Sequence, residues 1–422
     1  MSRMKLSSVE ADSMHAGTVI GKRVRRMRLV SGFGQVELAE RIGVASGTIS
    51  MLENDKVVPS GDLLRRIAHE VGCTVEYLAR PEVAVVSSRP WLRAYADAPQ
   101  KSLDMQTSDV TCAVEAILTL RLRRYPDLIP IHREDLEDYG TIESLAQDAR
   151  SAAGIGEGQR VGNMIRAAER LGCLVLPMRE ELGRHLGLST RVHDVPVICV
   201  SRPHDDPTRD VPGDRQRFTV AHELGHLALH TGLDAPLSAE EARRIERQAH
   251  RFAGAFLAPG DAMVNAVTER GGRVTLNVLA GIKSEWGVSI KALVTRMRDI
   301  ALIDEEQARS LFKQISSRGW NRQEPVGVGN ESAQWLAKAF RNIDENWLEV
   351  TGLKASHQDR WTRWNRVEAH SLAPLLKIQQ SRFPGEEGGQ ARRGTRSMQR
   401  ETPSYLIPAS KPQPPSTKKT PK

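Results

Sequence analysis

The sequence has few of the features that mark disulfide-bonded, secreted or membrane-spanning proteins. Its 422 residues contain 4 Cys, and no two of them form a CxxC pair. A disulfide framework or a cysteine-zinc site is therefore not expected, and we predict that these thiols are small buried side chains. There is no run of about 18 apolar residues, and residues 1–17 lack the apolar segment of a signal peptide. We therefore expect a cytoplasmic protein that makes no contact with a membrane.

Aromatic residues are also scarce, at 5% of the chain. This scarcity favours helical cores rich in Leu, Val and Ala over a β-sandwich. The 60 Lys and Arg outnumber the 52 Asp and Glu, which gives a formal net charge of +8. Such an excess favours contact with polyanions such as nucleic acid. At about 150 residues per domain, the length allows two or three domains.

The hydrophobic pattern changes several times along the chain. Apolar residues recur at helical spacing in the first part, Pro90 and Pro99 interrupt the pattern, and β-branched runs at 172–178 and 195–200 lie among further helical patterns. The end of the chain is rich in Gly, Pro, Ser and basic residues. We predict an all-α domain at 17–80, a linker at 81–107, an α+β domain at 108–325, an accessory helical segment at 326–382 and a disordered basic tail at 383–422.

The strongest chemical signal is HELGH, residues 222–226, within a helical apolar pattern. Residues four apart lie one turn above each other on a helix, so His222 and His226 can bind the same zinc ion. Glu223 lies on the neighbouring face, where it would reach a metal-bound water and act as a general base. The spacing therefore predicts a zinc site with a catalytic carboxylate.

A catalytic zinc site needs a third protein ligand and an open position. The metzincin pattern is excluded, because Gly232 stands where its third histidine would be. In the helix expected at 238–257, Glu246 lies at the edge of the apolar face, where a carboxylate is costly to bury unless a cation meets it. We therefore predict Glu246 as the third ligand, with Glu241 as the alternative.

Two further histidines lie near these positions. His230 continues the row of His222 and His226, but three stacked histidines would crowd one ion. We therefore expect His230 to support a metal ligand or to end the helix. His250 follows Glu246 by one turn and is expected to orient it through a hydrogen bond. The simpler alternatives are that HELGH lies by chance on a core helix, that Glu246 is solvated, and that His250 is a surface residue.

These motifs resemble the ImmA/IrrE family of metallo-endopeptidases. The residues that carry the resemblance are RQRFTVAHELGHLALH (215–230), ERQAHRFAGAFLAP (246–259) and SLFKQISSRGWNRQEP (310–325). The resemblance covers roughly residues 108–325 and implies a zincin-like fold with a gluzincin-type site completed by a downstream Glu, here Glu246. It also implies that the substrates are helix-turn-helix repressors of stress-response or mobile-element genes. His250 departs from the family, which usually has Asn at this position.

The first domain has the spacing of a helix-turn-helix. Ala39 is small where two helices would cross, Gly43 permits a tight turn, and Ile49 would bury the second helix against the first. The recognition helix is then expected at 46–53, with its first residues in the major groove and Gln35 near a phosphate. This part of the chain resembles the lambda-repressor-like (Cro/XRE) family over nearly its whole length.

The side chains expected to contact DNA are mostly small or basic. The candidates for contacts with bases are Ser46, Thr48 and Ser50. The candidates for contacts with phosphates are Gln35, Arg23, Arg25, Arg26, Arg28 and Lys56. No Arg or Asn leads the recognition helix, so discrimination between bases is expected to be weak, or the domain binds other helix-turn-helix proteins. The alternatives are a helical packing module without DNA contact and an arginine cluster that is only a solvated face.

These features together predict a DNA-binding regulator with a zinc endopeptidase domain that cleaves a repressor. The expected partners are double-stranded DNA and a helix-turn-helix repressor protein as substrate, and the sequence leaves a homodimer open. The rival hypothesis is a transcriptional regulator of the XRE type, whose peptidase-like domain senses a ligand without cleaving anything.

Overall fold

The computed structural model describes most of the chain between residues 21 and 364. The described residues are 21–80, 87–88, 99–122, 136, 138–179, 185–201, 211–230, 238–341 and 347–364. They all belong to one unit of the chain, residues 1–377. The predicted basic tail, residues 383–422, lies outside the described residues, as does most of the predicted linker. No helix in the described part has the length and apolar character to cross a bilayer.

The N-terminal part is helical, as predicted. Its helices are α2 (Gly21–Val30), α3 (Gln35–Ile42), α4 (Ser46–Glu53), α5 (Gly61–Val71) and α6 (Val75–Ala79). Gly43 ends α3 with a φ of 68°, a left-handed conformation that glycine adopts at little cost. Ser60 caps α5 by accepting a hydrogen bond from the backbone N–H of Leu63. Leu38 and Ile49 are fully buried between the helices, so α3 and α4 pack as a helix-turn-helix pair.

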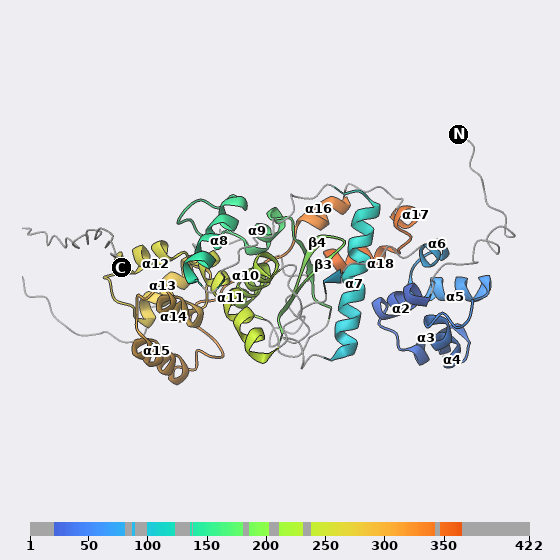
Figure 1. The fold of residues 1–422 in the computed structure, drawn as a ribbon, viewed down its shortest axis with the longest axis horizontal. Helices are drawn as coiled ribbons and strands as arrows, with labels where there is room; N and C mark the ends of the chain where they lie inside the picture. The colour runs from blue at the N-terminus through green and yellow to red at the C-terminus, as the bar shows by residue number, and fades with distance from the viewer. Residues whose placement is uncertain are drawn as a thin grey trace, which may run out of the picture. The chain divides into compact units, whose positions relative to one another are not determined.

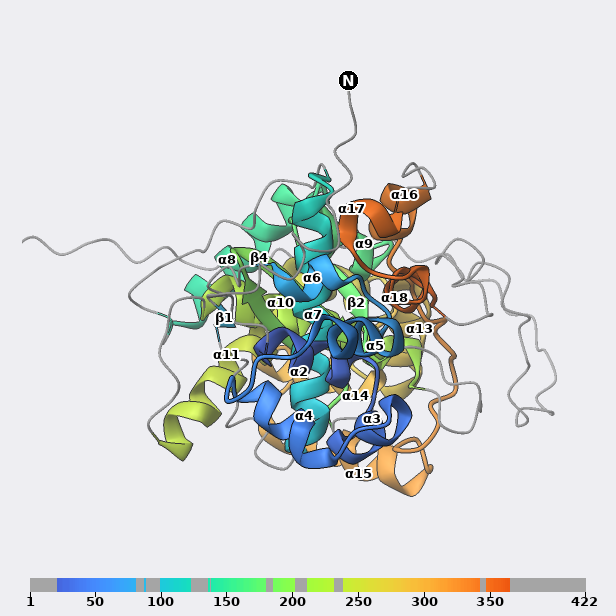
Figure 2. The same cartoon turned by 90° about the vertical axis from the view of Figure 1, so that its right-hand side faces the viewer.

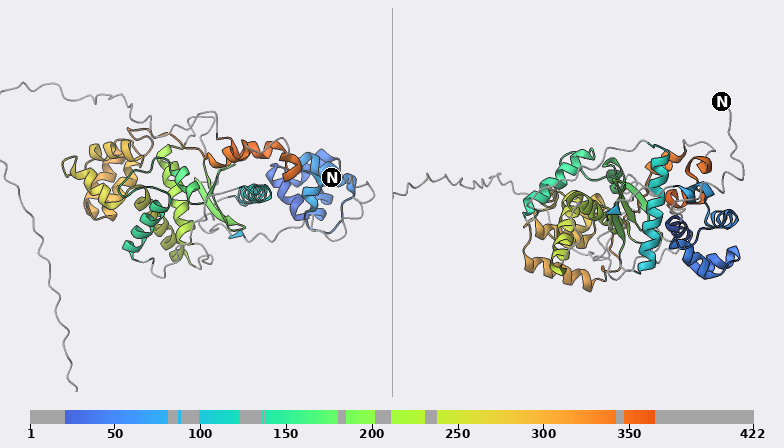
Figure 3. Two further views of the ribbon diagram at one scale, coloured as in Figure 1. Left: turned by 90° about the horizontal axis from the view of Figure 1, so that it is seen from above. Right: turned by 45° about the vertical axis from the view of Figure 1, so that its right-hand side comes forward.

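A long helix, α7 (Gln100–Thr119), lies between this helical domain and a small sheet (Figures 1 and 3). Val110, Ala113 and Ile117 are among its many buried residues. The helix begins within the predicted linker, 81–107, and continues into the predicted second domain. A helix that is covered on two sides has no single apolar face. This explains why the hydrophobic pattern did not indicate a helix in its first turns.

The sheet has the strand order β1-β3-β4-β2. Its strands are β1 (Ser87–Ser88), β2 (Leu174–Pro177), β3 (Gly187–Val192) and β4 (Val195–Val200). β2 runs parallel to β4, and β3 runs antiparallel to both β1 and β4. Val197 and Cys199 belong to the core shared with α7, whereas Ile198 and Val200 belong to the core on the other face. Both faces are therefore covered, which explains the continuous apolar run of β4. Neither β1 nor β3 was predicted.

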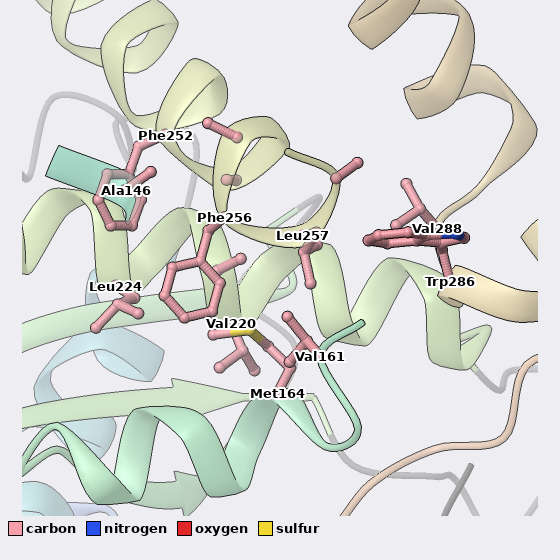
Figure 4. Close-up of a cluster of buried hydrophobic side chains, with 14 of the residues drawn as sticks. Ala146, Val161, Met164, Val220, Leu224, Phe252, Phe256, Leu257, Trp286 and Val288 are labelled. Atoms are coloured by element: carbon pink, nitrogen blue, oxygen red, sulfur yellow. The ribbon is translucent and has the colours of Figure 1, made fainter. Parts of the chain in front are cut away.

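The second face of the sheet is covered by a helical layer. The helices of this layer that contact the strands are α9 (Met164–Arg170) and α10 (Gly213–Leu229). The same part of the chain also forms α8 (Tyr139–Ala152), α11 (Ala239–Leu257), α12 (Gly260–Thr268), α13 (Leu276–Trp286), α14 (Ile290–Asp299) and α15 (Glu305–Ser317). Figure 4 shows Phe252 and Phe256 of α11 packed over Val220 and Leu224 of α10, and all four side chains are fully buried. This contact fixes the two helices that carry the HELGH sequence and the predicted third ligand.

The C-terminal helices return to the helix-turn-helix domain. They are α16 (Trp335–Arg341), α17 (Trp347–Thr351) and α18 (Ala355–Thr362), which lie in the predicted accessory segment. The backbone N–H of Thr74 donates to the carbonyl of Gly352 at 2.8 Å, and that of Lys354 donates to the carbonyl of Gly72 at 3.0 Å. His357 also contacts the Gly72 carbonyl at 3.1 Å. Residues far apart in the sequence thus attach the C-terminal segment to the connection between α5 and α6.

Buried charges join α2 to α7. The Glu115 carboxylate accepts hydrogen bonds from Arg23 at 3.2 Å, from Arg26 at 2.7 Å and from the hydroxyl of Tyr77 at 2.8 Å. Arg23 has only 3% of its side chain exposed. The helix-turn-helix domain is therefore fastened to α7 by a carboxylate that three of its side chains share.

Replacing Glu115 with Ala is expected to lower the free energy of unfolding by about 3 kcal/mol, because the buried Arg23 guanidinium loses its carboxylate. Urea denaturation of the full chain measures the change. The matched control is Asp104→Ala, which removes the exposed pair with Arg25 on the same two helices and is expected to cost less than about 1 kcal/mol. Equal losses in the two variants would show that Glu115 does not fasten the domain.

Candidate metal centre and nucleic-acid interface

The HELGH sequence lies near the C-terminal end of α10, where α11 crosses it. Gly225 lies at the crossing: a Cβ added there would lie 3.1 Å from the Phe252 ring and 3.2 Å from the carbonyl oxygen of Ala249. Glycine within a helix costs about 1 kcal/mol relative to alanine, but here it lets the backbones approach closely. This approach brings Glu246 of α11 to the histidine face of α10.

His222, His226 and Glu246 converge on one point. The Nε2 atoms of the two histidines lie 3.1 Å apart. The Glu246 carboxylate oxygens lie 3.2 Å from His222 Nε2 and 3.5 Å from His226 Nε2. Ligands bound tetrahedrally at zinc–nitrogen distances near 2.05 Å would be about 3.3 Å apart. Among the described residues, these three form the group whose ligand atoms are close enough to share a metal ion.

The charges of this group favour an electropositive partner. Burial alone would lower the pKa of His222, but its hydrogen bond with Glu246 and the charges of Glu223 and Glu246 raise that pKa. For Glu246, burial acts to raise the pKa, and hydrogen bonds from His222 and His226 outweigh it and lower it. Glu246 keeps 42% of its side chain exposed, so the site is reachable from solvent. The donor set of two imidazoles and a carboxylate fits a catalytic zinc ion.

Glu223 is held by the strand that packs against α10. Its Oε2 atom accepts a 2.6 Å hydrogen bond from the hydroxyl of Ser189 on β3, and only 5% of the residue is exposed. Gly187 on the same strand leaves the space that this requires, because a Cβ there would lie 2.4 Å from Thr219 and 3.1 Å from Glu223 Cγ. Ser189 was missed by the sequence analysis, since β3 mixes polar and apolar residues and was not recognised as a strand.

His230 contacts a metal-site histidine from the side opposite the converging Nε2 atoms. Its Nδ1 lies 3.1 Å from Nδ1 of His226, and its Nε2 lies 3.1 Å from Oε1 of Gln248 on α11. Burial, followed by the proximity of His226, lowers the pKa of His230 to about 3. His230 is therefore in a position to support His226, as expected. Gln248, which contacts His230, was not predicted.

Two sequence-derived candidates lie elsewhere. Glu241 is in the first turn of α11, and the structure does not bring it into the group of converging ligand atoms. The ring of His250 packs against Phe218, with centroids 4.7 Å apart, and lies 6.5 Å from the ring of His222. Among the described residues, the contacts of the His250 ring are thus with α10, and its predicted hydrogen bond to Glu246 stays a prediction.

Buried ion pairs anchor the N-terminal half of α10. Lys283 donates to Asp214 and to Glu324, each at 2.6 Å, and Arg217 pairs with Glu331. Both cations are almost fully buried. Glu324 lies in the third segment of the sequence resemblance, and it also accepts hydrogen bonds at the start of α14. These contacts, which the sequence did not reveal, fix the helix that carries the metal-site histidines.

On the helix-turn-helix domain, α3 and α4 lie on the side away from α7 (Figures 1 and 2). Ser46 and Lys56 are exposed, and Thr48 and Ser50 are half-buried. The amide of Gln35 donates to Glu53 at 2.8 Å instead of pointing into solvent. The predicted phosphate contact of Gln35 therefore requires that this hydrogen bond be broken.

The arginines of α2 are largely engaged within the protein. Arg23 and Arg26 bind Glu115, and Arg28 binds Glu53 through two hydrogen bonds of 2.5 and 2.8 Å. Contacts of these three arginines with phosphates, as predicted, would therefore require their ion pairs with the carboxylates of α7 and α4 to be broken. Arg25 keeps 56% of its side chain exposed.

Comparison with known families agrees with both parts of the chain. A family model described as a helix-turn-helix matches residues 24–78. A peptidase-family model described as an IrrE N-terminal-like domain matches residues 168–298. Among curated proteins, none matches the chain. The chain therefore carries a DNA-binding helix-turn-helix domain followed by an α+β domain of a peptidase family, which confirms the predicted architecture and fold class.

Proposed function

We propose that the chain is a DNA-binding regulator whose second domain is a zinc-dependent endopeptidase acting in the cytoplasm. The observation that carries the proposal is the convergence of His222, His226 and Glu246 beside the buried carboxylate of Glu223. A helix carrying two histidines by chance would not have a carboxylate of a second helix in contact with both Nε2 atoms.

Each polar side chain has a distinct part in this reaction. His222, His226 and Glu246 would hold the zinc ion, which lowers the pKa of bound water towards about 7 and polarises the peptide carbonyl. Glu223 takes the proton of the attacking water and passes it to the leaving amine. Ser189 holds the Glu223 carboxylate in place through its hydrogen bond to Oε2.

The proposed substrate is a repressor with its own helix-turn-helix, and this choice rests on the resemblance to the ImmA/IrrE family. The direct test is to incubate the zinc-loaded full chain with helix-turn-helix proteins from its own genome and to identify fragments by mass spectrometry. A single new N-terminus in one of these proteins, absent when zinc is chelated, supports the proposal. Intact substrates throughout would contradict it.

One observation favours the rival function, in which the second domain senses a ligand without cleaving it. α7 contacts both domains: Glu115 binds the helix-turn-helix domain, and the Gln106 side chain contacts Cys199 of β4 at 3.3 Å. A change at the sheet could therefore reach the DNA-binding domain through one helix. The two functions differ in their need for Glu223. Cleavage requires it as a general base, whereas a sensor does not.

Binding to DNA is expected to depend on the exposed cations that remain. Lys56→Ala should reduce the slope of log affinity against log salt by about 1, because each phosphate contact releases about one counterion. Filter binding of the full chain to its own promoter measures the slope. Lys101→Ala, on α7, is the matched control and should leave the slope unchanged. If both variants behave alike, Lys56 does not contact DNA.

A further inference from the structure

A chain of buried side chains leads away from the metal centre. It runs from His226 to His230, then to Gln248, and ends at the backbone carbonyl of Leu136, which accepts a 3.1 Å hydrogen bond from the Gln248 amide. His226, His230 and Gln248 are 5%, 1% and 8% exposed. Polar groups buried to this degree must satisfy one another, so the direction of each hydrogen bond can be worked out.

The direction is set at the end of the chain, by Leu136. A carbonyl oxygen only accepts, so Nε2 of Gln248 must donate to it, and Oε1 of Gln248 must face His230. Nε2 of His230 then carries the proton that this oxygen accepts. A neutral imidazole has one donor and one acceptor, so Nδ1 of His230 accepts from Nδ1–H of His226. Nε2 of His226, which faces Glu246 and His222, is then the ring nitrogen left to bind a metal ion.

We propose that Gln248 is a positioning residue for the metal centre, acting through His230 to hold His226 in the tautomer that can bind a metal ion. The proposal rests on the proposed zinc site. A metal-bound histidine is oriented by the hydrogen-bond partner of its other ring nitrogen. For His226 that partner is His230, which is itself oriented by its hydrogen bond with Gln248. α11 thereby contributes twice: Glu246 as a ligand, and Gln248 two residues later as the group that fixes another ligand.

Two substitutions separate this role from simple support of the fold. Gln248→Leu and Gln248→Glu both lose the hydrogen bond to Leu136, because neither new side chain donates at neutral pH. Only the glutamate keeps an acceptor for Nε2–H of His230. Zinc affinity of the full chain, measured by competition with a chromophoric chelator, is expected to fall about 10- to 100-fold in the leucine variant. The glutamate variant is expected to retain the affinity of the unchanged protein.

The matched control is Gln216→Leu on α10. Gln216 is also buried and makes three hydrogen bonds with Ser201 and Glu331, and none of these involves the histidines. Its loss should lower the melting temperature and leave zinc affinity unchanged. A second readout is the nitrogen-15 spectrum of the histidines in the metal-free full chain. It should show His226 protonated at Nδ1 in the unchanged protein and in the glutamate variant, and a mixture of tautomers in the leucine variant.

The results decide the two hypotheses separately. If the unchanged protein binds zinc and the leucine variant binds it equally well, or if the leucine and glutamate variants lose affinity equally, the role of Gln248 is refuted while the proposed function stands. If the unchanged protein binds no zinc, the proposed function is refuted. The histidine spectrum then decides whether Gln248 sets the tautomer of His226.

Discussion

Replacing Glu223 with Gln is expected to abolish cleavage of the substrate protein while zinc remains bound. Glutamine has the same size, and its amide oxygen can still accept the hydrogen bond from Ser189. It cannot take a proton from water, and the loss of a general base typically costs about 100- to 10,000-fold in rate. The measurement compares the initial rate of fragment formation in the two proteins, together with zinc content per chain.

The control for this experiment is Glu241→Gln. It makes the same carboxylate-to-amide change in the first turn of α11, outside the group of converging ligand atoms. It should leave cleavage unchanged. The same variants in the cell separate the enzyme from the sensor: if Glu223→Gln still switches the target genes normally, proteolysis is not how this protein regulates them.

Replacing the converging ligands is expected to remove the metal. The full chain should hold one zinc ion, and changing both His222 and His226 to Ala should reduce the zinc content to background. Glu246→Ala should weaken binding by more than the about 10- to 100-fold caused by loss of a supporting contact, because it removes a ligand. Zinc retained after dialysis against a chelator, measured by atomic emission, gives the stoichiometry.

Glu241→Ala is the matched control for the third ligand, since both glutamates are carried by α11. It should retain zinc, because Glu241 is not among the residues whose ligand atoms converge with those of the histidines. Stoichiometric zinc in the double histidine variant would refute the site. A greater loss of zinc in Glu241→Ala than in Glu246→Ala would make Glu241 the third ligand.

The features that the sequence determined by itself are those that follow from local geometry. His222 and His226 share a face because one helical turn separates them, and Glu223 is placed beside them by the same geometry. The amphipathic pattern of α11 pointed to Glu246, since a carboxylate at the edge of an apolar face needs a cation. Gly43 marked the turn of the helix-turn-helix because few other residues adopt its positive φ.

The features that only the tertiary structure decided depend on which surfaces cover one another. An arginine such as Arg23 can bind a phosphate or a carboxylate, and its sequence position does not show which. The packing of α7 on α2 placed the Glu115 carboxylate beside it. Ser189 of β3 reaches Glu223, and Gln248 of α11 reaches His230, and in each case the two residues belong to different elements. Sequence periodicity reports the apolar face of a single element. It does not report the partner that covers that face, because that choice is made by the free energy of packing the whole chain.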